Sequence, residues 1–90
     1  MTNVFDKDPN AVLDYQWDWS AWLETGETIS TALVTVPTGL TLDSQVDTTT
    51  SVTAWLSGGT AGTGYAVLCH ITTSAGREDD RQIIIRCRER

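Results

Sequence analysis

The residue types that could support catalysis are few in this chain of 90 residues, which has a single imidazole at His70. A histidine beside a serine hydroxyl or a cysteine thiol would suit nucleophilic attack on an acyl group. Cys69 adjoins His70, but neighbouring side chains of a strand point to opposite faces of a sheet, so the two would not meet. We therefore expect His70 to be a surface histidine on a sheet.

Paired carboxylates are a second source of catalysis, because two acids can hydrolyse a glycosidic bond. Asp14 and Asp18 lie close in sequence, and Asp79 adjoins Asp80. A chain this short leaves no room for a cleft around a sugar, and adjacent acids at a hairpin end are usually solvated. The sequence therefore predicts a protein that is not an enzyme and has no catalytic residues.

A metal site is suggested by one short motif. The segment DKDPN places Asp6, Asp8 and Asn10 at the spacing that opens a calcium-binding loop. The pattern then fails, because Ala11 stands at the glycine position and Trp17 stands where a bidentate glutamate would close the site. A zinc site is poorer still, with one histidine and two dispersed cysteines in the chain. We expect neither a metal nor another cofactor.

The two cysteines, Cys69 and Cys87, invite a disulfide. They lie on the two arms of a predicted hairpin, and matching the apolar faces of these arms sets Cys69 opposite Arg81 and Cys87 near Gly62 or Thr63. The cysteines are then separated by about six residues of strand at roughly 3.3 Å each, well beyond the ~7 Å that a disulfide allows between Cα atoms. Both are therefore expected to be reduced and buried.

Tryptophan is concentrated in the stretch DYQWDWSAWLETGETI, which holds Trp17, Trp19 and Trp22 beside several acids. Aromatic rings flanked by carboxylates can hold a sugar by stacking and by hydrogen bonds to its hydroxyls. Tryptophans also fill a small core efficiently, since each buries on the order of 200 Å². We expect Trp17 and Trp19 in the core, whereas Trp22 and Trp55 are candidates for contact with a partner.

These side chains must be positioned by strands, because apolar and polar residues alternate with period two along much of the chain. Threonine is the commonest residue and lysine occurs once, a composition that favours strands over helices. Ser20 is expected to cap a short helical turn. Strands are expected at residues 12–19, 28–36, 40–42, 50–58, 65–74 and 81–90.

The predicted fold class is all-β, a single immunoglobulin-like β-sandwich of roughly six to seven short antiparallel strands. A small barrel is the alternative. Residues 1–11 are expected as an N-terminal arm or loop and residues 12–90 as the sandwich domain. The expected core comprises Tyr15, Trp17, Trp19, Leu23, Val34, Val36, Val52, Leu56, Tyr65, Val67, Cys69, Ile71, Ile83, Ile85 and Cys87.

Charge is distributed unevenly along the chain. Residues 1–45 carry seven acids and one lysine, whereas residues 46–90 carry five acids and five arginines. This distribution argues against nucleic acid as a partner, because affinity for phosphates comes from clustered basic residues. No apolar run approaches the about 20 residues that a membrane helix needs, and the N-terminus lacks the pattern of a secretory signal. We expect a soluble protein that contacts no membrane.

The last predicted strand offers a surface for protein contacts, because Arg86, Arg88 and Arg90 alternate outward with Ile84. The simplest interpretation is a solvated sheet face. A sharper hypothesis is a head-to-tail contact in which the acidic half of one copy meets this basic stripe on the next, the type of interface that closes a ring. The candidate interface residues are Phe5, Trp22, Trp55, Ile84, Arg86, Arg88 and Arg90.

Two blocks of sequence, DPNAVLDYQWDWSAWLETGETI and VTAWLSGGTAGTGYAVLCHITTSAGREDDRQIIIRCRER, resemble small structural proteins of tailed bacteriophages. These are described as fiber–tail adaptor or head–tail region proteins, and the resemblance covers residues 8–90. It implies an immunoglobulin-like virion component without enzymatic activity, made in the bacterial host cytoplasm and built into an oligomer of the neck, tail or capsid surface. Cys69 and Cys87 stand where such proteins more usually have Thr or Val.

The expected function is therefore that of a bacteriophage structural protein, a neck or tail adaptor or a capsid-surface component. Its expected partners are other phage structural proteins and copies of itself, in a ring or lattice. The alternative is a carbohydrate-binding module in which Trp22, Trp55 and nearby acids hold a host-surface glycan. A small hydrolase built around His70 is a third option.

Overall fold

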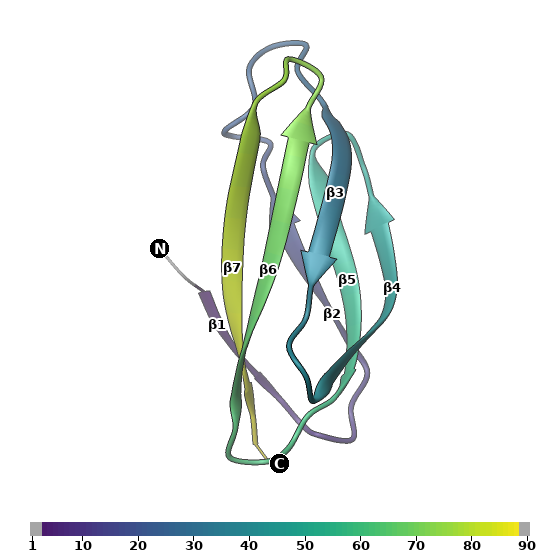
Figure 1. The fold of residues 1–90 in the computed structure, drawn as a ribbon, viewed down its shortest axis with the longest axis vertical. Helices are drawn as coiled ribbons and strands as arrows, with labels where there is room; N and C mark the ends of the chain where they lie inside the picture. The colour runs from purple at the N-terminus through teal and green to yellow at the C-terminus, as the bar shows by residue number, and fades with distance from the viewer. Residues whose placement is uncertain (1–2, 89–90) are drawn as a thin grey trace.

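The structure, a computed structural model, describes residues 3–88 of the chain. Within these residues it contains strands and turns but no helix, which confirms the predicted all-β class (Figure 1). No helix in this part of the chain is therefore long and apolar enough to cross a membrane. The seven strands are β1 (Asn3–Lys7), β2 (Leu13–Asp18), β3 (Ile29–Thr35), β4 (Leu40–Asp47), β5 (Ser51–Gly58), β6 (Gly64–Thr73) and β7 (Glu78–Cys87).

The strands form two sheets that pack as a sandwich (Figure 1). One sheet has four strands in the order β1-β7-β6-β3, and the other has three in the order β2-β5-β4. The orders β7-β6-β3 and β2-β5-β4 match the G-F-C and B-E-D strands of an immunoglobulin-type sandwich. The sandwich predicted from alternation is thus confirmed, and it measures 43 × 24 × 19 Å.

The N-terminal segment differs from the expected loop. Residues 3–7 form β1, which pairs with β7 in parallel, whereas every other strand pair is antiparallel as predicted. Val4 lies beside Ile84 and Phe5 beside Ile85 in the register. A parallel neighbour needs a long connection rather than a tight turn, and here the whole rest of the sandwich separates the two strands in sequence.

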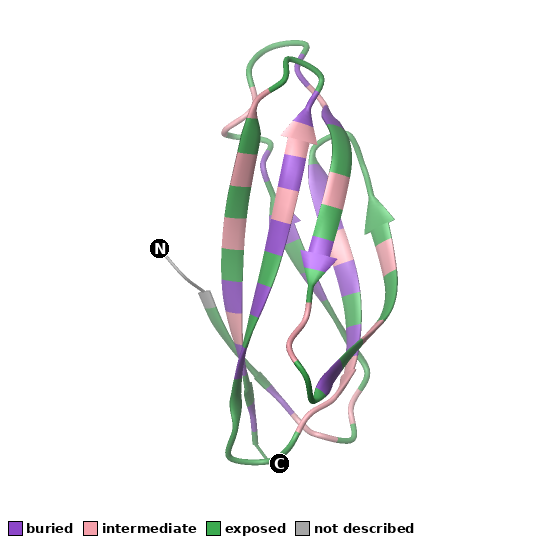
Figure 2. Ribbon diagram, in the orientation of Figure 1, coloured by how far each residue is buried: buried purple, intermediate pink, exposed green. Residues whose placement is uncertain are grey.

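The hairpin of β6 and β7 has the register that the sequence predicts, with Cys69 opposite Arg81. At its open end, the backbone N–H of Cys87 donates to the carbonyl of Thr63 (3.0 Å), and the N–H of Gly62 donates to the carbonyl of Cys87 (2.8 Å). Both cysteines are buried and free. Burial alternates along β6 as the period-two pattern requires (Figure 2).

The core lies between the sheets. Of the residues expected there, Leu23 and Val36 are partly buried and pack against the core, and the others are all buried. Ile29, Leu40 and Ala54 complete the buried cluster. Ala54 is one of the small residues of β5, opposite Tyr15 on β2, and it leaves room there for the large ring.

The short turn after β2 is capped by a different residue from the one predicted. The carboxylate of Asp18 accepts a hydrogen bond from the backbone N–H of Ser20 (2.8 Å), which lowers the pKa of Asp18. The N–H groups of Trp22 and Leu23 then donate to the carbonyl of Trp19. One turn forms and no helix follows, because the chain must re-enter a sheet at Ile29.

At the other end of the sandwich, Tyr65 fixes the corner between β5 and β6. Its hydroxyl oxygen accepts a hydrogen bond from the backbone N–H of Thr60 (3.0 Å), as in the tyrosine corner of immunoglobulin-type domains. Gly39, with φ of +106°, lies against this ring, and a Cβ there would be 2.8 Å from a Tyr65 ring carbon. The glycine of the turn between β3 and β4 is therefore required by conformation and by space.

Candidate interaction surfaces

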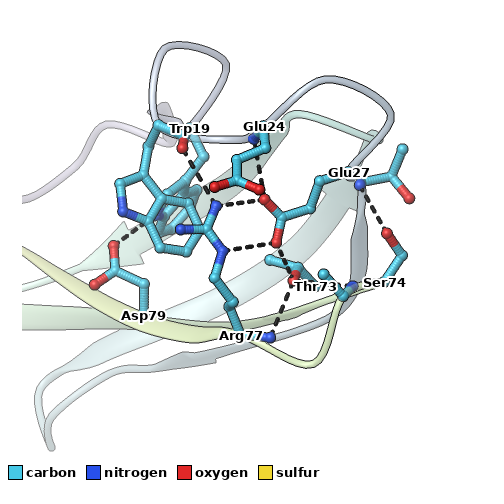
Figure 3. Close-up of polar contacts among 10 residues, drawn as sticks. Trp19, Glu24, Glu27, Thr73, Ser74, Arg77 and Asp79 are labelled. Carbon is cyan, nitrogen blue, oxygen red and sulfur yellow. Dashed lines mark hydrogen bonds and ion pairs between the residues drawn. The ribbon is translucent and has the colours of Figure 1, made fainter.

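The loop between β2 and β3 packs on the turn between β6 and β7 at one end of the sandwich, the upper end in Figure 1. The contact centres on Glu27, whose carboxylate accepts hydrogen bonds from Arg77 Nε (2.8 Å), from Arg77 Nη2 and from Thr73 Oγ1 (2.6 Å) (Figure 3). The Glu27 side chain is only 4% exposed. A buried carboxylate is costly unless it is paired and hydrogen-bonded, and here it is both.

The pairing changes the ionisation of both groups. The bidentate Arg77 guanidinium, followed by the backbone N–H of Glu24 and the hydroxyl of Thr73, lowers the pKa of Glu27 to about 2. The same contact raises the pKa of Arg77. Glu27 is therefore a carboxylate throughout the physiological pH range, and the ion pair acts as a permanent clamp between the loop and the hairpin turn.

The tryptophans of the motif are mostly enclosed by this end of the sandwich. Trp19 is fully buried, and its indole N–H donates to the carboxylate of Asp79 (2.9 Å), while the guanidinium of Arg81 lies 4.8 Å from its ring centre. The ring of Trp22 is half-buried and lies 4.0 Å beneath the guanidinium of Arg77. Cation–π contacts of this type hold a ring in place and cover one of its faces.

The two sequence blocks that carry the family resemblance therefore meet in space. The first supplies Trp19 and Glu27, and the second supplies their partners Asp79 and Arg77 (Figure 3). Trp22, also from the first block, lies beneath Arg77. Sequence reasoning noticed the tryptophans but missed the Glu27–Arg77 pair. A single acid and a single arginine fifty positions apart give no periodic signal that would join them.

His70 lies on the outer face of the four-stranded sheet. Its Nε2 lies 2.9 Å from a Glu78 carboxylate oxygen, and its Nδ1 contacts the carboxylate of Asp80. These acceptors, Asp80 first, raise the pKa of His70. Carboxylates only accept hydrogen bonds, so both ring nitrogens donate when the ring is protonated, and each nitrogen faces a carboxylate rather than a hydroxyl. The geometry does not support His70 as a general base.

Lys7 joins the two sheets at the opposite end of the sandwich. It is the single lysine of the chain and is fully buried, and its Nζ donates to the carbonyls of Gly58 (2.7 Å) and Asp8 (3.0 Å). The carboxylate of Asp8 accepts the backbone N–H of Asn10 (2.8 Å) in a local turn. The DKDPN motif therefore forms a strand end and a turn, and no cluster of metal-ligating residues occurs within the described residues.

The outer face of the four-stranded sheet carries a row of apolar residues, of which Ile84 is half-buried and the others are exposed. Val4 pairs with Ile84 and Ile84 with Ala66, while Leu68 is the next outward residue on β6 and Leu33 on β3 lies diagonally beyond it. Val4 is 52% and Leu33 64% exposed. We call these five residues the apolar band. It crosses all four strands of the sheet.

Charged residues flank the apolar band at both ends. Arg86 and Arg88 lie at one end, where Arg88 Nη1 is 3.4 Å from the carboxylate of Asp6. Glu78 and Asp80, which hold His70, lie at the other end. Of the predicted basic stripe, Arg86 and Arg88 are exposed, and Arg90 falls outside the described residues.

The outer face of the three-stranded sheet has a different character. Trp55 is 39% exposed and lies between Asp14 on β2 and Ser44 on β4, while Val46 is 54% exposed on the same face. None of these three strands contains a lysine, an arginine or a histidine. Trp55 therefore lies beside one acidic residue, Asp14, and on a different element from Trp22.

Phe5, the remaining interface candidate, lies at the edge of the sandwich on β1. Its ring is tilted against that of Tyr15, with 5.3 Å between the ring centroids. It is 36% exposed, so it covers the open side of the core and is also accessible to a partner.

Comparison with protein families decides the class of the molecule. A model of the family described as "Podophage GP4 fiber-tail adaptor protein gp77" matches residues 7–86. The chain belongs to this family. The match extends from the end of β1 almost to the end of β7, so the family spans both sheets and both ends of the sandwich. Comparison with curated proteins gives no match.

Family membership confirms the resemblance to phage tail adaptor proteins that the two sequence blocks indicated. It also indicates that this β-sandwich is a structural protein of the phage fiber-tail adaptor type. The residues that the family match covers include the Glu27–Arg77 clamp, the apolar band from Leu33 to Ile84 and the acidic face around Trp55, while Val4 and Phe5 precede it.

Proposed function

We propose that this protein is a non-enzymatic structural adaptor of a phage virion, present in several copies, that connects fibre and tail through protein–protein contacts. The observation that carries the proposal is the family match over residues 7–86. Its partners are other structural proteins of the phage and copies of itself. An adaptor of this type needs surfaces that bind partners and a body that keeps them at a fixed distance.

The body of this sandwich is suited to that purpose. The Glu27–Arg77 ion pair fixes the loop and turn at one end, and Lys7 ties β1 to the end of β5 at the other. Buried, hydrogen-bonded charges of this kind are expensive to separate. An ion pair with a buried carboxylate at one end and the hydrogen bonds of a buried lysine at the other give a rigid connector, in contrast to the mobile loops that many enzymes use around substrates.

The surfaces support protein contact. A small monomer rarely leaves so many large apolar side chains exposed on flat faces, and such residues commonly mark protein–protein interfaces. Here both outer faces have them, Val4, Leu33 and Leu68 on one and Trp55 and Val46 on the other. Nucleic acid is a poor partner for the aspartate-rich face, because it would meet carboxylates.

The proposed absence of catalysis is supported by the engagement of His70 with two carboxylates. Synthesis in the host cytoplasm fits the two free, buried thiols, since disulfides rarely persist in a reducing compartment. A glycan-binding platform would need exposed rings that act together, but Arg77 covers Trp22 while Trp55 lies on another face. The geometry therefore favours protein partners over sugar.

The proposal can be tested on particles. A phage from which the gene is deleted should assemble heads and tails that lack attached fibres, as counted by negative-stain electron microscopy, and the gene supplied in trans should restore the fibres. The variant His70→Ala should restore them as well as the wild-type gene does. A deletion phage with a full set of fibres would contradict the adaptor function, and failure of His70→Ala to complement would reopen the catalytic hypothesis.

A further inference from the structure

The two outer faces of the sandwich differ in charge in a way that makes them complementary. The strands of the three-stranded sheet contain no basic residue, and Asp14, Asp18 and Asp43 are exposed outside the core, whereas Asp47 lies opposite buried Val52 on the inner side. Asp14 lies directly beside Trp55 on this face. Within residues 3–88 the Asp14 carboxylate takes part in no ion pair, so its charge is available to a partner.

The four-stranded sheet offers the matching pattern. Arg86 is exposed and follows Ile84 by two residues on β7, so the two side chains lie next to each other on the outer face. Arg86 has no ion-pair partner among the described residues, whereas neighbouring Arg88 contacts Asp6. One face therefore combines a free aspartate with an exposed tryptophan, and the other combines a free arginine with the apolar band.

We propose that copies of this chain pack head to tail, with the outer face of the four-stranded sheet of one copy on the outer face of the three-stranded sheet of the next. Arg86 then lies against Asp14, and the apolar band lies against Trp55 and Val46. The inference rests on the proposed function in that an adaptor present in several copies needs such a contact. The proposed contact further specifies which two faces meet and that they are different faces of the two copies.

Contacts between like faces explain the observations less well. Two three-stranded sheets packed together would bring Asp14 of one copy toward the same acidic face of the other, and none of these strands supplies a basic residue to pair with it. Two four-stranded sheets could bring Arg86 toward Glu78 and Asp80, but both acids are already engaged by His70. That arrangement would also leave Trp55 uncovered. The head-to-tail contact covers both apolar surfaces and pairs both free charges.

A head-to-tail contact leaves one unused face at each end of the pair, so it continues until a ring closes or a filament forms. This property separates it from a two-fold dimer and makes it testable with two complementary variants. Leu68→Glu places a charge in the apolar band, and Trp55→Glu places one on the opposite face. Both side chains are exposed, so neither substitution removes core volume.

The experiment is sedimentation velocity on the purified full chain over a range of protein concentrations. Wild-type protein should associate beyond a dimer. The association constant of each variant alone should be lower by a factor of about ten or more, as expected when a central interface residue is lost. An equal mixture of the two variants should form a one-to-one complex that does not grow, because one intact pair of faces remains. Val12→Glu, at an exposed site outside both sheets, is the matched control and should associate as wild type does.

Several outcomes would overturn the head-to-tail contact. One is a wild-type protein that stays monomeric, and another is a variant that associates as strongly as wild type. A third is a mixture that stays monomeric although the melting curve of each variant shows that it is folded. A variant that fails to fold is replaced by the charge pair Arg86→Asp and Asp14→Arg, whose double variant should recover the association that each single variant loses. None of these results bears on the fibre counts of the deletion phage, so the proposed function stands or falls separately.

Discussion

The guanidinium of Arg77 donates hydrogen bonds to both carboxylate oxygens of Glu27 and lies 4.0 Å from the ring centre of Trp22. One arginine thus pairs with a buried acid and covers an aromatic ring. This arrangement joins the loop after β2 to the turn before β7, and it brings the two sequence blocks that carry the family resemblance into contact.

The Glu27–Arg77 pair should make the stability of the fold depend on pH in the acidic range. The pKa of Glu27 is lowered to about 2 from an ordinary value of 4.5, so its contribution is fully present above pH 4.5 and is lost as the pH falls through the folded-state pKa. We expect the melting temperature of wild type to fall between these pH values. Glu27→Gln should be less stable at neutral pH and should lose much of this acid dependence. Glu24→Gln, at an exposed neighbouring acid, should retain it.

Arg77→Ala should destabilise the fold more than Glu27→Gln does. Removal of the guanidinium leaves the buried Glu27 carboxylate without its cation, whereas Glu27→Gln leaves the charge of Arg77, whose side chain is 38% exposed and can be solvated. It also uncovers Trp22, so intrinsic fluorescence should shift toward longer wavelength. An Arg77→Ala protein as stable as Glu27→Gln would show that the ion pair does not hold this end of the sandwich.

Lys7→Met should lower the free energy of unfolding by about 1–3 kcal/mol, because the carbonyl of Gly58 loses its donor in a buried environment. Methionine keeps most of the apolar stem, so the change tests the hydrogen bonds rather than packing. Urea denaturation is the measurement. Arg88→Met, at an exposed cation on the same edge, should change stability by no more than about 0.5 kcal/mol.

Loss of the hydroxyl should have different effects on stability at the two tyrosines, Tyr65 and Tyr15. Tyr65→Phe should cost about 1 kcal/mol, because the backbone N–H of Thr60 loses its acceptor. The hydroxyl of Tyr15 is buried without a hydrogen-bond partner among the described residues, so Tyr15→Phe should be neutral within about 0.5 kcal/mol or stabilising. Equal losses for the two variants in urea denaturation would contradict this assignment.

Gly39→Ala should lower the stability of the fold more than Gly62→Ala does, although both glycines have positive φ. A Cβ at residue 39 would meet the Tyr65 ring, whereas at residue 62 it would meet nothing within 4 Å. Both variants carry the backbone strain, and only the first carries the steric conflict, which we expect to add about 1–3 kcal/mol. The difference between their thermal unfolding curves isolates the packing of this corner.

Alternation along the strands made most of the fold predictable. The faces of β6 and β7 defined a register that placed Cys69 opposite Arg81, and the structure has that register. The failure at β1 has a physical reason. The segment contains Asp6 and Lys7, and a lysine is almost never fully buried, so a polar segment looked like an arm although Lys7 is enclosed by backbone carbonyls.

Long-range contacts account for the rest of what the sequence did not predict. Pairing between Glu27 and Arg77 depends on the loop and the hairpin reaching the same end of the sandwich, which follows from strand order and not from local pattern. The separation of Trp22 from Trp55 depends on topology in the same way. The apolar band became visible only with the register, because its five residues come from four strands.

The central claim, that this chain is a structural component of the virion, is tested most directly by its copy number in purified particles, measured by mass spectrometry with isotope-labelled peptides. We predict a small, fixed number of copies per particle, in an integral ratio to the fibre protein, as symmetric assembly on a tail requires. Absence of the chain from particles, or an amount that varies between preparations, would contradict the account.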